Sequence, residues 1–169
     1  FESDVSGTAR LAEIPVGANF VGNLAMDRYV PAGVTGYRFI SAAVSGSDVD
    51  VGQWDESMVL SIPDGNEGCA GSPCWLSVRK YDETQQGVDT IGYVGITTIA
   101  HPIAAGAGYL VYHGTTPSTT PAYTFTTAGP TNKFGTALPV TYAASSPPLL
   151  DDDGWNLVGN PYPSAIDWD

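Results

Sequence analysis

His101 and His113 are the residues of this sequence best suited to acid–base catalysis, because histidine titrates near neutral pH. They stand in the segments IAHPIA and VYHGT. The sequence has no H-E-x-x-H, G-x-S-x-G, phosphate-loop or G-x-G-x-x-G pattern, and no spacing that brings an acidic partner to either ring. A catalytic histidine needs such a partner in a pocket. We therefore predict a protein that is not an enzyme and has no catalytic residues.

Neighbouring carboxylates are a second source of chemistry, since glycosidases use two of them. All the candidate pairs stand in turn-rich segments of a very acidic chain, which favours solvated turns. The pairs are Asp48 with Asp50, Asp55 with Glu56, and Asp82 with Glu83.

The segment DDDG at 151–154 is the best candidate for an ion site. Asp151 and Asp153 are spaced as at the start of a calcium loop, but the distal Glu of an EF-hand is missing. Two interpretations stay open: calcium bound by Asp151 and Asp153, or an exposed acidic turn. No other cofactor is expected.

Aromatic residues offer a binding surface in place of a reaction. Four tryptophans and nine tyrosines are enough for a carbohydrate platform if several are exposed together. Trp54 stands in the polar segment VGQWDES, so we expect it to be exposed and to bind ligand together with Tyr81 and Tyr93. Trp75 and Trp155 each begin an apolar run, which predicts that both pack in the core.

Cys69 and Cys74 stand close together in CAGSPC. The Gly and Pro between them favour a turn that brings the two Cα atoms within disulfide distance, and two thiols are too few for a zinc site. We predict a local disulfide, with free thiols as the alternative. A disulfide indicates an oxidising compartment outside the cytoplasm.

The net charge of −12, from six basic and eighteen acidic residues, sets limits on partners. Such a surface repels phosphate backbones, so the sequence argues against nucleic-acid binding. No apolar run reaches the length needed to span a bilayer, so membrane insertion is not expected.

The elements that must position these residues are short strands. Glycine and proline recur along the whole chain, no window keeps a helical apolar period, and β-branched or aromatic runs alternate with turn signals. This predicts a single all-β domain over 1–169, an antiparallel β-sandwich or jelly roll with almost no helix. Gly-Tyr pairs at 36, 92 and 108 are expected to begin strands. The expected strands are 18–30, 36–44, 57–62, 74–82, 91–99, 108–114, 122–129, 137–143 and 155–160.

Several segments, in the same order, resemble a family of large secreted and cell-surface proteins of Bacteroidetes, many of which carry a sorting domain of the type IX secretion system. The similarity covers residues 8–169. The segments that carry it are GWNLVGNPYPSAIDWD (154–169), MDRYVPAGVTGYRFISAAVSG (26–46), VGQWDES (51–57), GAGYLVYHG (106–114) and YTFTTAGPTNKFGTALPVTY (123–142). The resemblance implies an extracellular or cell-surface location and an adhesin-like role.

The closing segment also has a structural interpretation. Prolines at 161 and 163 force extended backbone before each of them and remove two donors, which predicts a sharp corner. We expect this corner to be built from Trp155, Asn160, Pro161, Tyr162, Pro163 and Trp168.

We expect a non-catalytic extracellular module, a fragment of or processed from a longer surface protein, that serves adhesion or a structural filament. It would bind copies of itself or another surface protein by β-strand addition. The alternative is a carbohydrate-binding module of a secreted hydrolase. The tripeptide DTI fits the O-glycosylation pattern of exported proteins in this phylum, which makes Thr90 a candidate acceptor and the chain a candidate glycoprotein.

Overall fold

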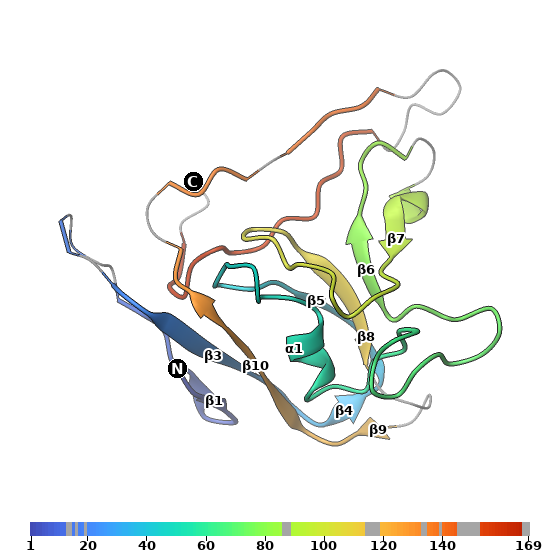
Figure 1. The fold of residues 1–169 in the computed structure, drawn as a ribbon, viewed down its shortest axis with the longest axis horizontal. Coiled ribbons are helices and arrows are strands. Elements are labelled where there is room, and N and C mark those ends of the chain that lie inside the picture. Colours follow the sequence, from blue (N-terminus) through green and yellow to red (C-terminus); the bar gives the residue numbers. More distant parts are fainter. Residues whose placement is uncertain are drawn as a thin grey trace.

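The structure is a computed structural model, and it confirms an all-β, antiparallel fold with very little helix (Figure 1). The residues that it describes are 1–12, 15, 17–18, 20–85, 89–113, 119–132, 135–138, 140–144 and 153–166. Within them, no helix is both long enough and apolar enough to cross a membrane. The prediction of a sandwich or jelly roll stays a prediction.

A four-stranded sheet forms the centre of the molecule. Its strands are β5 (Gly36–Ile40), β8 (Tyr109–His113), β6 (Val78–Tyr81) and β7 (Tyr93–Gly95), in that spatial order, and all neighbours are antiparallel. The Gly-Tyr prediction is confirmed, because β5 begins at Gly36, β7 at Tyr93 and β8 at Tyr109.

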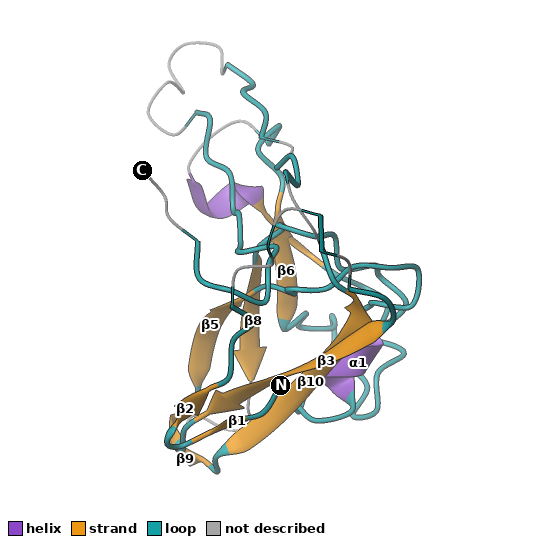
Figure 2. Cartoon of the chain, turned by 90° about the vertical axis from the view of Figure 1, so that its left-hand side faces the viewer, coloured by secondary structure: helices purple, strands orange, loops and turns teal. Residues whose placement is uncertain are grey.

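A long two-stranded ribbon covers the inner face of this sheet. β3 (Asn23–Val30) pairs with β10 (Tyr123–Pro130), and the ribbon crosses the end of the sheet in Figure 2. Two shorter pairs complete the strands that the structure describes. They are β1 (Ser3–Asp4) with β2 (Gly7–Thr8), and β4 (Gly33–Val34) with β9 (Thr119–Thr120).

Trp54 lies at the centre of the core, in the short helix α1 (Gly52–Asp55). It is 0% exposed, and its ring meets Tyr109 of β8 at 5.5 Å and Phe125 of β10 at 6.3 Å, edge to face. Its Nε1 donates to Thr127 Oγ1 at 3.1 Å. The expectation that Trp54 is exposed is therefore wrong: a single helical turn within a polar-looking segment directs the indole into the gap between sheet and ribbon.

Three expected strands are absent from the described residues: 57–62, 137–143 and 155–160. In the first of these, Met58, Leu60 and Ile62 are buried in alternation, as in a strand. The Ser61 amide, however, donates to Ser77 Oγ at 2.8 Å. In a regular strand this amide would pair with the backbone of a neighbouring strand. The alternating apolar residues of this segment therefore reflect burial. Side chains, and not only backbone groups, form hydrogen bonds with its backbone. A 3-10 helix, Asp89–Gly92, replaces the start of expected strand 91–99.

Truncation of Trp54 tests its central position. We expect Trp54→Ala to lower the free energy of unfolding by about 3–5 kcal/mol, because it removes a large, fully buried ring and leaves a cavity. Trp155→Ala is the matched control: that ring is 60% exposed, and its loss should cost under about 1 kcal/mol. Urea denaturation followed by circular dichroism measures both, and equal losses would contradict this account of the core.

Candidate functional site

The outer face of the four-stranded sheet carries a row of aromatic side chains. Along β8, Tyr109, Val111 and His113 are buried while Leu110 and Tyr112 alternate to the other side, and the strand register carries this alternation across the sheet. The aromatic residues on the outer side are Tyr37 and Phe39 of β5, Tyr112 of β8, Tyr81 of β6 and Tyr93 of β7. Together with Trp75 and Trp155, which flank them, we call this surface the aromatic face.

Trp75, Tyr37 and Tyr112 form a cluster at one end of the aromatic face. The Trp75 ring packs edge to face against Tyr112 at 4.8 Å, and Tyr37 packs against Tyr112 at 5.1 Å. The predicted disulfide between Cys69 and Cys74 is confirmed, and it directly precedes Trp75. The Trp75 amide donates to Ala70 O at 3.0 Å, so the disulfide loop holds the indole in place.

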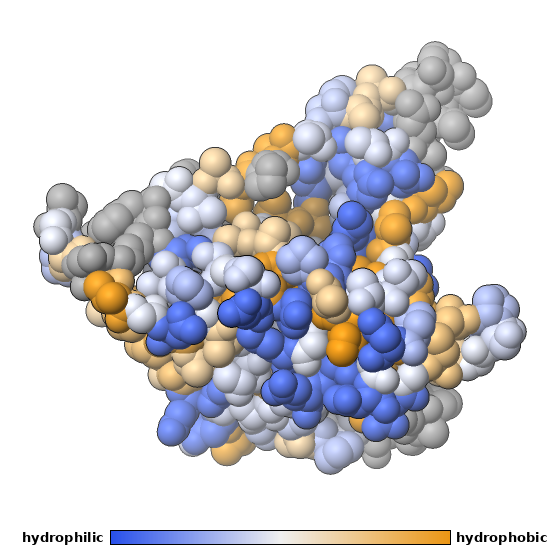
Figure 3. Space-filling model, in the orientation of Figure 1, coloured by the Kyte–Doolittle hydropathy of each residue, from blue (hydrophilic) through white to orange (hydrophobic). Residues whose placement is uncertain are grey.

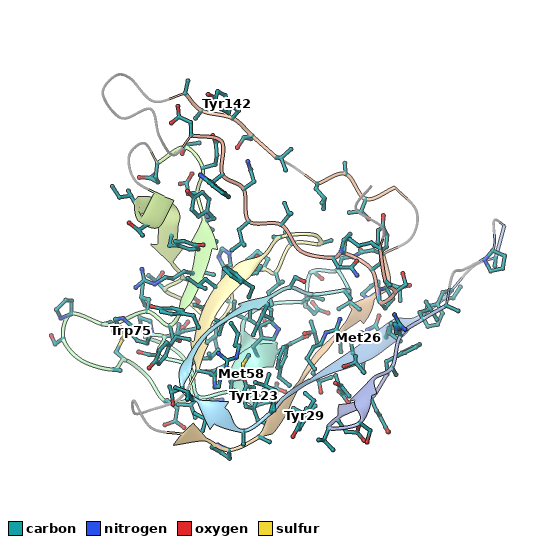
Figure 4. All side chains as sticks on the ribbon, turned by 180° about the vertical axis from the view of Figure 1, so that it is seen from behind. Met26, Tyr29, Met58, Trp75, Tyr123 and Tyr142 are labelled. Carbon is teal, nitrogen blue, oxygen red and sulfur yellow. A yellow bond between two sulfur atoms is a disulfide. The ribbon has the colours of Figure 1, made fainter. Side chains whose placement is uncertain are left out.

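The expectation that Trp75 packs in the core is wrong, because its side chain is 38% exposed. It precedes the sheet on the outer side, where Tyr37 and Tyr112 cover only part of the ring. Figure 4 shows Trp75 at the left of the view, well apart from Tyr142 at the top.

Tyr81, Tyr93 and Trp155 form the other end of the aromatic face. The Tyr81 and Tyr93 rings meet edge to face at 5.1 Å, as cross-strand neighbours of β6 and β7. A methyl group at Gly92 would lie 2.5 Å from Tyr81 Cζ, so only glycine permits this ring position. The three rings line a cavity of about 260 Å³, together with Phe39, Asn156 and Leu157.

Trp155 stands between this cavity and a second, wider hollow of about 580 Å³ that is lined by Tyr142, Thr141 and Val140. Trp155 is 60% exposed, so the expectation that it packs in the core is also wrong. Gly154 has a positive φ of 80°, and Trp155, which follows it, turns outward. Leu157 and Val158, further along, approach the sheet at Gly108. The segments on either side of this hollow run across the upper part of Figure 1, and Figure 3 shows a recess beneath them.

Two side chains hold the irregular segment 140–144 against the sheet. Asn156 Nδ2 donates to Thr141 O at 2.8 Å, and Asn156 Oδ1 accepts from the Thr141 amide at 3.1 Å. Glu83 accepts from Thr141 Oγ1 at 2.8 Å and from the amide of Ala143. A side-chain amide and a carboxylate thus replace the ladder that a strand at 137–143 would have formed.

The closing segment docks beside the start of β8. Gly108 donates to Leu157 O at 3.0 Å and Gly159 donates to Gly106 O at 2.9 Å, which places Trp155 over the sheet. A bend then follows at 162–164. The Asn160 side chain accepts from the Tyr162 amide at 2.9 Å and donates to Ser164 O at 2.6 Å.

The corner is anchored to distant parts of the chain. Pro161 O accepts from Asn132 Nδ2 at 2.6 Å, Tyr162 Oη accepts from the Thr136 amide at 2.8 Å, and Pro163 O accepts from the Leu11 amide at 2.8 Å. Pro161 and Pro163 are buried. Trp168, the last residue expected in this corner, lies outside the described residues.

The structure brings only part of the predicted ligand site together. Tyr81 and Tyr93 are neighbours on the aromatic face, whereas Trp54 is in the core on the opposite side of the sheet. The contributions of Tyr37, Phe39 and Tyr112 were missed. A signal for them exists in GYRFIS and GYLVYHG, where aromatic residues occupy alternate positions, but the sequence does not say which alternate set faces the core.

The predicted modification and ion sites lie away from the aromatic rings or outside the described residues. Thr90 is exposed in the 3-10 helix Asp89–Gly92. Asp151 is outside the described residues, and Asp153 is half-buried. Among the residues that the structure does describe, no three His, Cys, Asp or Glu side chains gather as a metal ion would require.

The histidines and paired carboxylates form no catalytic arrangement among the described residues. His113 is buried on the inner side of β8 against Tyr123, with ring centres 5.0 Å apart, and His101 packs near Tyr109 at 6.3 Å. Asp55, expected in a solvated turn, is instead buried, and its carboxylate accepts from the Asn66 amide at 2.7 Å. These contacts are structural.

Comparisons of the chain with protein-family models, with curated proteins and with solved structures found no significant match.

Asn156 provides a test of how the aromatic face is held. We expect Asn156→Ala to speed hydrogen exchange at the Thr141 amide roughly tenfold, since the variant removes its acceptor and the donor to Thr141 O. Asn132→Ala is the control, because it removes a hydrogen bond of the corner and none of segment 140–144. Hydrogen exchange followed by mass spectrometry measures the rate at the Thr141 amide in both variants. An unchanged rate in Asn156→Ala would contradict the role given to Asn156.

Because His113 is buried, we expect the protein to lose stability in mild acid. Burial lowers the pKa of His113 below its usual 6.5, and the nearby Arg38 guanidinium lowers it further. The unfolded chain therefore takes up a proton as the pH falls below about 6.5, while the folded chain resists it, so stability is present above that pH and decreases below it. His113→Phe should reduce this decrease.

The measurement is the urea midpoint between about pH 7.5 and pH 5. Burial and Lys80 also lower the pKa of His101, so His101→Phe is the comparison variant and the double variant should lose the most pH dependence. A His113→Phe protein that loses stability as steeply as the original chain would contradict the prediction.

Proposed function

We propose that this chain is a non-catalytic, extracellular binding module of an adhesin-like surface protein, and that it binds neutral glycans on the aromatic face. The observation that carries the proposal is the exposure of large rings on one side of a sheet: Phe39 is 69% exposed, Trp155 60% and Tyr37 44%. Isolated exposed apolar residues are ordinary, but a contiguous set of them marks an interaction surface.

Sugar rings suit this surface chemically. The C–H groups on one side of a pyranose carry partial positive charge, and the face of an aromatic ring carries partial negative charge, so the two stack. Trp155, Tyr81 and Tyr93 line a cavity of about 260 Å³ rather than a flat patch. Asn156 lines the same cavity and supplies an amide that suits hydroxyl groups.

The position of the two ends of the aromatic face favours an extended ligand. The register places the Trp75 cluster beside Tyr37 and Tyr112, at the end of β8, whereas Tyr81 and Tyr93 lie level with the start of β8, beside the Trp155 cavity. A glycan chain that runs along the strands would contact rings at both ends. The net charge of −12 disfavours acidic polysaccharides, which leaves neutral ones.

An extracellular location is supported by the disulfide between Cys69 and Cys74. This bond orders the loop before Trp75, so the binding surface depends on an oxidising environment. The resemblance to secreted Bacteroidetes surface proteins supports the same location and an adhesive role. The exposure of Thr90 is compatible with O-glycosylation, and calcium at Asp151 and Asp153 remains a separate proposal.

A glycan array tests the proposal. We expect saturable binding to neutral polysaccharides, and roughly fivefold weaker binding for Trp155→Ala and for Tyr93→Ala, since each removes a stacking surface worth about 1 kcal/mol. Tyr29→Ala is the matched control: Tyr29 is a half-buried tyrosine of β3 (Figure 4) and is not among the residues that line the Trp155 cavity, so its loss should leave glycan binding unchanged.

Two outcomes would overturn the proposal. One is the absence of binding to every neutral glycan on the array. The other is concentration-dependent self-association in sedimentation that Trp155→Ala abolishes, which would assign the aromatic face to a second copy of the chain.

A further inference from the structure

The free edge of β5 is a second surface, and its backbone groups are available to pair with a partner. β5 is at the end of the four-stranded sheet, and its only strand neighbour is β8. The Tyr112 amide donates to Ser77 O at 2.8 Å, on the β6 side. Tyr112 therefore does not exchange backbone hydrogen bonds with Tyr37, its partner in the β5 register. In an antiparallel pair this alternation directs the backbone groups of Tyr37 and Phe39 away from β8.

The two free sides of the ribbon of β3 and β10 are covered. At the free side of β3, the Phe1 amino group donates to Ala25 O at 2.7 Å and the Asp27 amide donates to Phe1 O at 2.9 Å. At the free side of β10, the Gln53 amide group pairs with Ala128 in both directions, at 2.8 and 3.0 Å. Such covering prevents unwanted strand pairing.

The β5 edge has no equivalent cover among the described residues. Only Arg38 reaches over it: its guanidinium donates to Tyr37 O at 2.9 Å and to Val34 O at 3.4 Å. Apart from β8, no described residue forms a hydrogen bond with the amide or the carbonyl of Phe39.

A cavity of about 230 Å³ opens beside this edge, between the sheet and the ribbon. Its apolar lining includes Val30, Ile40 and Phe125, and its charged lining is Arg28 and Arg38. These are two of only six basic residues in a chain with eighteen acidic ones. Neither guanidinium forms an ion pair with a described carboxylate. The cavity therefore combines apolar contacts with unpaired positive charge.

We propose that an extended acidic segment of another protein chain adds to the sheet as a strand beside β5. Its backbone would pair with Tyr37 and Phe39, its inward-facing carboxylates would meet Arg28 and Arg38, and its outward-facing apolar side chains would lie beside the rings of Tyr37 and Phe39. Side chains of a strand alternate between its two sides, so a peptide in which acidic and apolar residues alternate places all its carboxylates on one side. Arg38 would exchange Tyr37 O for a carboxylate, a stronger charge-assisted contact.

The test measures the binding of a fluorescent peptide, in which Val and Asp alternate, to the 169-residue chain. We expect saturable binding that weakens with salt, and no binding of a control peptide in which Val and Lys alternate. Arg38→Gln should weaken binding roughly tenfold, while Arg38→Lys, which keeps the charge, should weaken it less. Equal binding of both peptides, or no binding of the acidic one, would overturn the proposal.

A pair of variants at Phe39 isolates the backbone contact. Phe39→Val keeps the outward amide and Phe39→Pro removes it, while both remove the ring. We expect Phe39→Pro to bind the peptide roughly three- to tenfold more weakly than Phe39→Val. Equal affinities of the two variants would contradict strand addition.

Hydrogen exchange in the unmodified protein provides a readout that does not depend on a variant folding. Bound peptide should slow exchange at the Tyr37 and Phe39 amides, and unchanged exchange under saturating peptide would overturn the proposal. Peptide binding and glycan binding are separable: Trp155→Ala should leave peptide binding unchanged, and Arg38→Gln should leave glycan binding unchanged.

Discussion

The packing of Trp54 between the sheet and the ribbon is the contact on which the rest of the structure depends. Its ring touches β8 and β10 at once, and Thr127 satisfies its single donor. Because Trp54 and the ribbon fill the inner side of the sheet, the register places Tyr37, Phe39, Tyr81, Tyr93 and Tyr112 on the outer side. The exposed aromatic surface is thus a consequence of which set of alternate residues the core has taken.

Irregular backbone covers part of the outer side, in place of a second sheet. Segments 140–144 and 153–158 lie over it, and Asn156 and Glu83 supply the hydrogen bonds that strand partners would otherwise make. Side-chain pairing of this kind leaves gaps, since it does not require the close and regular spacing of a ladder. The cavity between Trp155 and the two tyrosines is such a gap. A module with two complete sheets would have filled it.

The sequence predicts the fold class and much of the sheet, because alternation and turn residues act locally. The Gly-Tyr pairs marked the starts of β5, β7 and β8, and the spacing of Cys69 and Cys74 indicated the disulfide. The binding surface was predictable only in part. Trp54 looked exposed because its neighbours are polar, yet one helical turn buries it, and Trp155 looked buried because an apolar run follows it. Whether a tryptophan faces in or out depends on contacts far away in the sequence.

The two proposed surfaces share a strand and differ in what they recognise. Phe39 lines both the cavity beside Trp155 and the cavity beside Arg38, and its backbone faces the open edge. A strand added beside β5 would lengthen the sheet and so widen the aromatic face, without covering it. Assembly through the edge and adhesion through the face are therefore compatible in one molecule. This geometry suits a surface protein in which neighbouring modules present a continuous row of aromatic rings to a glycan.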